Sequence, residues 1–130
     1  MTIELEILTL SAILTIILWI PYILARVGIA GFAATLMYKS DDTVMPPWVV
    51  RAKRAHYNAV ENLIPFAILI LVAHSIGLSN EVTQSAAIAY FWLRLAHYIL
   101  HTVGLPFGRT IMFAGSWFAQ VCIAYQLIIF

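Results

Sequence analysis

The stretch from Ile111 to Phe130 reads IMFAGSWFAQVCIAYQLIIF and carries no charged residue. A helix of about 20 apolar residues is long enough to cross the hydrocarbon core of a bilayer. Three further apolar stretches of similar length precede it, at residues 7–25, 59–78 and 82–103. We therefore expect an all-α membrane protein, in which residues 1–130 form one domain with four transmembrane helices.

The composition of the whole chain agrees with a membrane protein. Hydrophobic residues make up 63% and charged residues 10%, and the mean hydropathy is +0.94. Soluble domains carry about 25% charged residues, so this chain has too few to cover a water-exposed surface. The net charge of +1 gives no indication of a nucleic-acid partner, and the single cysteine, Cys122, excludes an internal disulfide. Glu4 and Glu6 stand where a signal peptide would carry Lys or Arg, so we expect the first stretch to stay in the mature protein.

The connections between the apolar stretches predict how the helices run. The second connection, residues 75–81, and the third, residues 104–109, are short, whereas the first covers residues 26–53. Short connections make neighbouring helices antiparallel, which gives an up-down-up-down bundle. Pro21 predicts a kink or break late in the first stretch.

The distribution of Lys and Arg predicts the orientation in the membrane. Outside the spans these residues occur only in the first and third connections and at their edges: Arg26, Lys39, Arg51, Lys53, Arg54 and Arg109. The positive-inside rule then places both connections in the cytoplasm and both termini on the non-cytoplasmic side. The polar first half of the second helix and the polar second half of the third helix consequently lie at one depth, toward the cytoplasm.

On the second helix, Arg54, Asn58 and Glu61 are spaced i, i+4, i+7 and share one helical stripe. A charged side chain at the centre of a span costs about 2.5–3.5 kcal/mol on insertion scales. We therefore expect Glu61 to face the bundle and to pair with Arg54 or Arg94.

On the third helix, Arg94, His97 and His101 are spaced i, i+3, i+7 and again share a stripe. Two polar stripes at one depth indicate a single site, although pairing that only locks the helices together would give the same pattern. His56 and His74 are expected to be solvated, and no spacing of His, Cys, Asp and Glu predicts a metal site.

Such a site favours an anionic or zwitterionic ligand, because guanidinium groups form charge-assisted hydrogen bonds with carboxylates. A ligand thiol beside an Arg would have a lowered pKa and would be more nucleophilic as the thiolate. The bilayer would supply an apolar second substrate.

Three motifs in this region resemble a known family. Residues 51–66 read RAKRAHYNAVENLIPF, residues 94–98 read RLAHY, and a tight turn precedes Arg109 and Thr110. In this order they are similar to the membrane-associated proteins in eicosanoid and glutathione metabolism (MAPEG), in particular to prokaryote-like members. The resemblance runs from about residue 48 to the end of the chain.

The resemblance implies a homotrimer that holds glutathione between subunits near the cytoplasmic side, without a metal. By motif position, Arg109 would stabilise the glutathione thiolate. From its place within a span, Arg94 is expected to have a structural or pairing role. The implied glutathione contacts are Arg54, Asn58, Glu61, His97, His101 and Arg26.

The expected function is that of a glutathione-dependent transferase or peroxidase acting on lipophilic electrophiles. Tyr57 stands where some members carry a further Arg, and His101 stands where a Tyr is common. Two alternatives stay open. One is a small proton-coupled transporter of lipophilic cations that uses Glu61, and the other is a catalytically silent protein that only binds the ligand.

Overall fold

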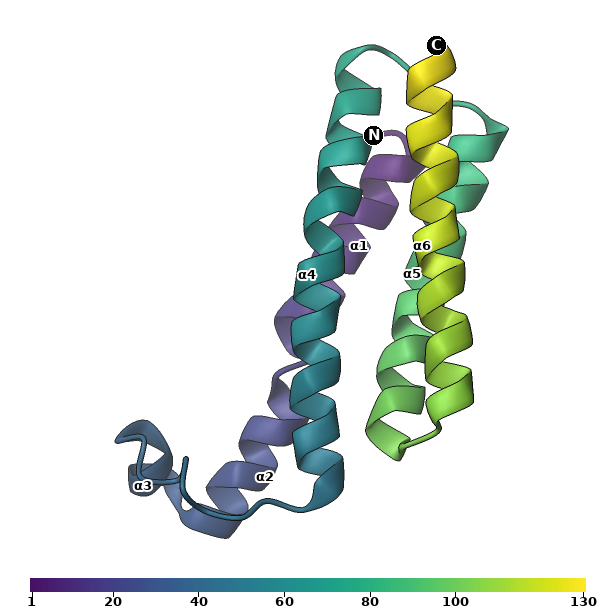
Figure 1. Ribbon diagram of the computed structural model, residues 1–130. Coiled ribbons are helices and arrows are strands. Elements are labelled where there is room, and N and C mark those ends of the chain that lie inside the picture. The colour runs from purple at the N-terminus through teal and green to yellow at the C-terminus, as the bar shows by residue number, and fades with distance from the viewer.

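The structure, a computed structural model, describes all residues 1–130 and contains only helices (Figure 1). The helices, in chain order, are α1 (Ile3–Ile17), α2 (Ile20–Ala30), α3 (Phe32–Leu36), α4 (Pro47–Ser75), α5 (Glu81–Val103) and α6 (Pro106–Ile129). The all-helical fold predicted from the sequence is confirmed.

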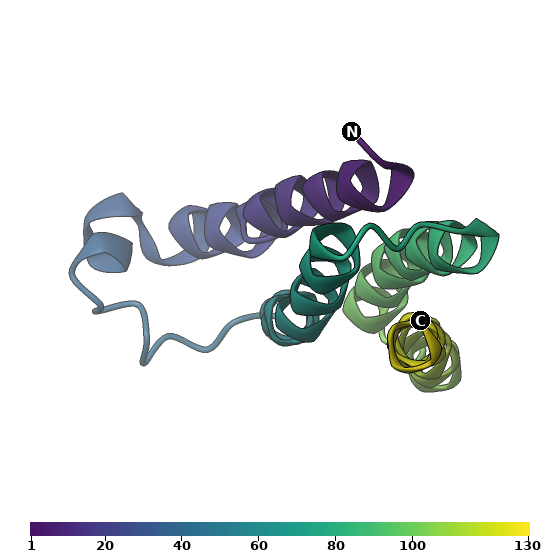
Figure 2. The same ribbon diagram turned by 90° about the horizontal axis from the view of Figure 1, so that it is seen from above.

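The long helices lie side by side and run alternately up and down. α5 packs most extensively against α6, and α1 contacts both α4 and α5, while α2 continues along α4. Seen from above, α1 and α2 form a row on one side of α4, and α6 lies on the far side of α5 (Figure 2). Both chain termini lie at one end of the bundle, and the connections from α3 to α4 and from α5 to α6 lie at the other (Figure 1).

Three helical segments are long and apolar enough to cross a membrane: Ile3–Ala30, Pro47–Ser75 and Pro106–Ile129. α5, the fourth expected span, has 23 residues but a more polar composition, and it is not among the three. Only 25 of the 130 residues are buried, and the outer surfaces of the helices carry many large apolar side chains. Such a surface requires lipid or another apolar partner, which agrees with an integral membrane protein.

Two helices begin earlier in the sequence than the apolar stretches predicted, because their first turns contain polar residues. α4 begins at Pro47, well before residue 59, because its first three turns are amphipathic rather than apolar. α6 likewise begins at Pro106, so that Gly104 and Leu105 alone connect it to α5. Pro at the first helical position is favoured in both cases, because the missing N–H would have no partner there.

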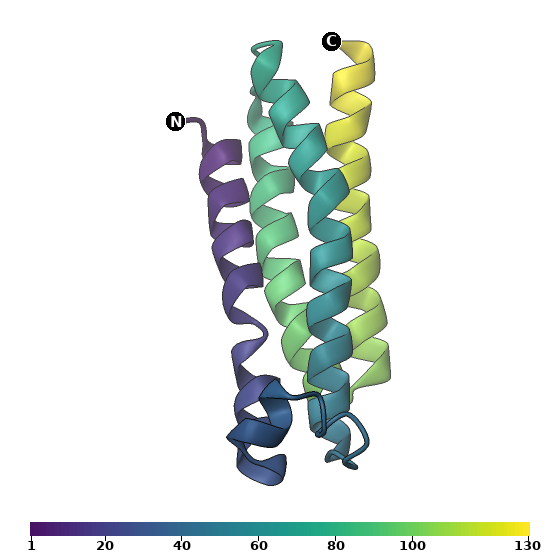
Figure 3. The same cartoon turned by 90° about the vertical axis from the view of Figure 1, so that its left-hand side faces the viewer.

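The break between α1 and α2 falls at Leu18 and Trp19, shortly before Pro21 (Figure 3). Two carbonyl oxygens at the break accept hydrogen bonds from side chains of other helices. The Nε2 atom of His56 contacts the Thr15 oxygen at 3.1 Å, and the Tyr98 hydroxyl donates to the Leu18 oxygen at 3.0 Å. A carbonyl only accepts, so Nε2 of His56 carries the proton. The expectation that His56 is solvated is therefore wrong, because its ring donates a hydrogen bond to a carbonyl oxygen near the break in the helix.

Two apolar clusters form the core. One lies where α2, α4 and α5 meet and includes Tyr22, Val49 and Tyr98, and the other lies where α4, α5 and α6 meet and includes Phe66, Tyr90 and Ile123. The α4 side of the first cluster consists of Val49 and three alanines, Ala52, Ala55 and Ala59. Small side chains let membrane helices approach closely, which brings the polar residues of α4 within reach of α5.

At the end of the bundle that holds both termini, Glu4 is buried, with a relative exposure of 3%. Its carboxylate accepts hydrogen bonds from the Thr83 hydroxyl at 2.6 Å and from the Ser79 hydroxyl at 2.9 Å. Asn80 caps α5 in this same region, and its Nδ2 donates to Oε1 of Gln126 on α6 at 2.9 Å. These contacts join the first turn of α1 to the start of α5 and the end of α6.

Candidate functional site

A polar cavity of about 220 Å³ lies between α4, α5 and α6, toward the end of the bundle opposite the termini. We call it the Arg109 cavity. It is lined by Asn58 of α4, by His97 and His101 of α5, and by Arg109, Thr110 and Phe113 of α6. The structure thus brings four of the residues predicted from the sequence, on three different helices, to one place.

The two histidines of the cavity present free ring nitrogens. Nη1 of Arg109 lies 3.4 Å from Nε2 of His101, and a guanidinium can only donate, so Nε2 of His101 accepts. The proton of the neutral ring then sits on Nδ1, which is buried without a partner, as is Nδ1 of His97. The rings of His97 and His101 meet edge to face with 5.5 Å between their centroids. Two ring nitrogens of the histidines that line the cavity therefore have no partner in the protein.

A second cavity of about 220 Å³ adjoins the first and shares His101 and Arg109 with it. Its other cation is Arg51, whose Nε donates to the Thr102 oxygen at 3.0 Å. Gly104, at φ +93°, leaves room for this guanidinium, because a Cβ atom there would lie 3.1 Å from Cζ of Arg51. Sequence reasoning did not assign Arg51 as a ligand residue. The sequence feature that could have identified Arg51 is its position one helical turn before Arg54.

Behind the Arg109 cavity, Arg94 is buried with a relative exposure of 4%. Its Nη2 atom donates to Oδ1 of Asn58 at 2.5 Å. The contact places the two predicted polar stripes at one depth, as the antiparallel arrangement of α4 and α5 requires. Glu61 is not the partner of Arg94, and it forms no ion pair at all.

Arg54 and Glu61 lie on the exposed face of α4 and line neither polar cavity of this subunit. At 100° per residue, Asn58 lies at one edge of this stripe, about 40° from Arg54 and about 60° from Glu61, so a neighbouring helix can cover Asn58 and leave the two charged residues free. Asn58 is half-buried against α5, whereas the two charged residues point away from the bundle.

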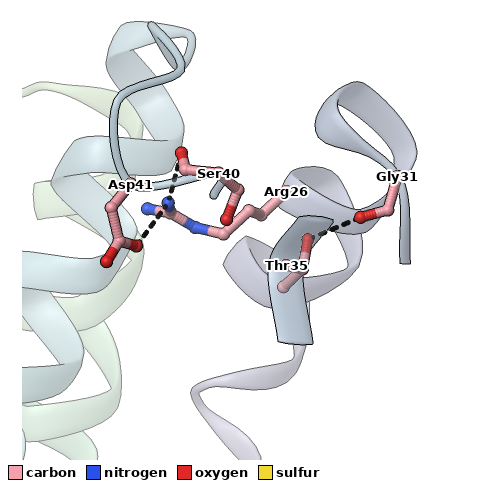
Figure 4. A network of polar contacts seen from close by, with 5 residues as sticks. All are labelled: Arg26, Gly31, Thr35, Ser40 and Asp41. Carbon is pink, nitrogen blue, oxygen red and sulfur yellow. Dashed lines mark hydrogen bonds and ion pairs between the residues drawn. The ribbon is translucent and has the colours of Figure 1, made fainter. Parts of the chain in front are cut away.

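Arg26, near the end of α2, also lies apart from the two cavities. Its Nη1 atom donates to the Ser40 oxygen at 3.1 Å and lies 3.6 Å from Oδ1 of Asp41 (Figure 4). Within this subunit Arg26 therefore holds the turn after α3 against α2.

Charge is distributed unevenly along the bundle. Apart from Arg94, all Lys and Arg residues lie in the connections at the Arg109 end or in the helical turns next to them, whereas Glu4, Glu6 and Glu81 lie at the other end (Figure 1). The excess of cations at the Arg109 end favours anionic ligands there. The largest cavity of the chain, about 620 Å³, is an apolar groove on α5 and α6 that contains no cation and belongs to a different surface.

The model of the MAPEG family matches residues 8–129 of this chain. A search among curated proteins gave no match.

Proposed function

The chain belongs to the MAPEG family, and we propose that it is a membrane-embedded glutathione-dependent transferase or peroxidase acting on lipophilic electrophiles. The observation that carries this proposal is the Arg109 cavity, where a guanidinium without a carboxylate partner lies among Asn58, His97 and His101. Glutathione carries two carboxylates and a thiol, and these groups match the cations and hydrogen-bonding groups of the two adjoining cavities.

Arg109 has the position and the charge to stabilise a thiolate. No carboxylate pairs with it, because the one ion pair of the chain joins Arg26 and Asp41. A nearby cation lowers the pKa of a thiol and raises the fraction of the nucleophilic thiolate. In the transferase reaction, the sulfur lone pair forms the new S–C bond, the leaving group departs with the electrons of the broken bond, and the thiol proton passes to water. In the peroxidase reaction, sulfur attacks a peroxide oxygen to form a sulfenic acid, and the alcohol leaves with the electrons of the broken O–O bond and takes up a proton. The thiol of a second glutathione then displaces water from the sulfenic sulfur, which forms the disulfide.

The carboxylates of glutathione would then be held by the remaining cations. Arg51 opens onto the second cavity, next to Arg109. Paired guanidinium–carboxylate hydrogen bonds are short and directional, so they would fix the ligand while its sulfur lies beside Arg109. His97 and His101 supply further contacts from α5.

The exposed face of α4 supports a homotrimer in which neighbouring subunits complete the site. Its exposed residues recur at heptad spacing: Val50, Arg54, Tyr57, Glu61, Ile64 and Ile68. This spacing is typical of a helix that packs against other helices, and lipid would be an expensive neighbour for Arg54 and Glu61. In such a trimer, these two residues would reach ligand held between subunits, together with Arg26. Four spans per subunit, with α5 as the fourth, and termini on the non-cytoplasmic side complete the arrangement.

The test uses the full-length protein in detergent. Calorimetric titration with glutathione should give saturable binding at millimolar ligand, and a chloronitrobenzene electrophile should be conjugated at a rate proportional to protein. No binding at millimolar glutathione would overturn the proposal. Binding without turnover would instead show a catalytically silent ligand-binding protein.

A proton-coupled transporter remains the second candidate, because Glu61 is exposed on α4 and unpaired. Arg54 on the same face would repel a cationic cargo, which makes this candidate weaker. Drug-dependent proton flux in liposomes that disappears in Glu61→Gln would favour transport over catalysis.

A further inference from the structure

A small cavity lies between α1, α4 and α5, and is separate from the polar cavities described above. Its volume is about 10 Å³, and its lining includes Ser11 and Thr15 of α1, Leu18 directly after α1, and Tyr90 and Arg94 of α5. This is room for about one water-sized occupant. Glutathione is far too large for it.

Arg94 brings a full positive charge to this cavity. The guanidinium stays protonated in proteins, and here it is buried with no carboxylate partner. Asn58 satisfies only Nη2, and both Nε and Nη1 lack a hydrogen-bond partner in the protein. A buried cation without a counter-charge is costly, so the cavity is electrostatically suited to an anion.

The remaining polar groups of the wall can also donate hydrogen bonds to an anion. The carbonyl oxygens of α1 are already engaged: the Ser11 oxygen accepts from the Thr15 hydroxyl at 2.8 Å, and the Thr15 and Leu18 oxygens accept from His56 and Tyr98. The Ser11 hydroxyl, in contrast, is buried and unpartnered. The groups that remain include the guanidinium N–H groups of Arg94 and the hydroxyls of Ser11 and Tyr90, each of which can donate a hydrogen bond to an anion.

We propose that this cavity is a binding site for a single monatomic halide ion, chloride in the cell, held by the guanidinium of Arg94 and the hydroxyl of Ser11. The ion would neutralise the buried charge and fix the guanidinium that holds Asn58 at the back of the Arg109 cavity. The site does not depend on the proposed glutathione chemistry, since its geometry lies entirely within one subunit.

The experiment measures thermal unfolding of the full-length protein in detergent while sodium gluconate is replaced by sodium chloride or bromide at constant ionic strength. The unfolding midpoint should rise with halide and saturate. Ser11→Ala should weaken the apparent halide affinity by about tenfold, the size of one hydrogen bond to a charged group. Ser75→Ala, which removes an exposed hydroxyl at the end of α4, is the matched control and should leave the halide response unchanged.

A second measurement locates the ion directly. Crystals grown with bromide should show an anomalous peak beside Arg94, and Arg94→Met, if it folds, should lack both the peak and the halide response. A midpoint insensitive to halide, or density beside Arg94 without anomalous signal, would overturn the proposal in favour of a bound water. Glu61 could instead supply the counter-charge by rotating inward. In that case halide would have no effect and Glu61→Gln would lower the unfolding midpoint, and this result would also overturn the proposal.

Discussion

Arg94 on α5 donates a hydrogen bond of 2.5 Å from Nη2 to Oδ1 of Asn58 on α4. Asn58 also lines the Arg109 cavity, so this contact joins the buried interior of the subunit to the candidate site. It is the only hydrogen bond that the protein gives the side chain of Arg94.

Replacing Asn58 by Ala should therefore destabilise the protein by about 1.5–3 kcal/mol, the usual value of a hydrogen bond to a charged group. Asn58→Asp keeps an acceptor and adds a counter-charge for Arg94, so it should be more stable than Asn58→Ala. Denaturant unfolding in detergent measures both variants. Equal stability of the two would show that Arg94 does not depend on this partner.

The depth of the site along the bundle can be predicted from the sequence. Which residues line it within one subunit cannot. Antiparallel helices and the positions of Asn58 and Arg94 already placed both stripes at one depth. Periodicity cannot show which edge of a stripe a neighbouring helix covers, so Arg54 and Glu61 were grouped with Asn58 although they face outward. Arg26 was grouped with them by resemblance, and within one subunit it lies beside Asp41.

Contacts between segments distant in sequence were the least predictable. Nothing near Glu4 in the sequence predicts its hydrogen bond with Thr83, which lies on another helix. The burial of Glu4 depends on how α1 packs against α5. His56 likewise depends on where α1 breaks, which Pro21 predicted only approximately. The apolar stretch predicted that the second span begins at residue 59, whereas α4 begins at Pro47. Hydropathy detects only apolar stretches, and the first turns of α4 are amphipathic.

Arg109→Ala should reduce turnover by about 100-fold or more, within the range found when one preorganised group that stabilises reacting charge is removed. Glutathione affinity should change much less, because Arg51 and the histidines remain. Lys39→Ala removes the same charge from an exposed turn and should retain full activity. Steady-state rates and calorimetry on the three proteins separate the two effects, and a loss of affinity equal to the loss of rate would contradict the assigned role.

Thr83→Val should destabilise the protein by about 1.5–3 kcal/mol, because the buried carboxylate of Glu4 loses its shortest hydrogen bond. The valine also removes the hydroxyl that caps the Asn80 backbone N–H. Thr9→Val, at an exposed position of α1, is the control and should change stability little. If thermal unfolding gave the same midpoint for both variants, the network around Glu4 would not anchor α1.

Gly104→Ala should cost about 1–2 kcal/mol, since an L-residue is strained in the left-handed region. The added Cβ would also press on the guanidinium of Arg51, 3.1 Å away, and should weaken glutathione binding. Gly28→Ala is the matched control: it lies in α2 with nothing within 4 Å of the added atom, so it should be neutral or stabilising. Unfolding and titration experiments on the two variants check both effects.

Ile64→Lys should break the proposed trimer, because it places a third charge on the exposed face of α4 that carries Arg54 and Glu61. Val44→Lys, in the connection before α4, adds the same charge at a position 91% exposed and should leave the assembly intact. Native mass spectrometry from detergent reports the oligomer directly. A wild-type monomer, or a trimer that survives Ile64→Lys, would exclude this face of α4 as the interface.

The most direct test of the central claim is an experimental structure of the full-length protein determined in the presence of glutathione. We predict glutathione density in the Arg109 cavity, with the sulfur beside Arg109 and a carboxylate near Arg51. A structure at saturating glutathione that shows no ligand there, or shows it bound away from Asn58, His97, His101 and Arg109, would contradict the account.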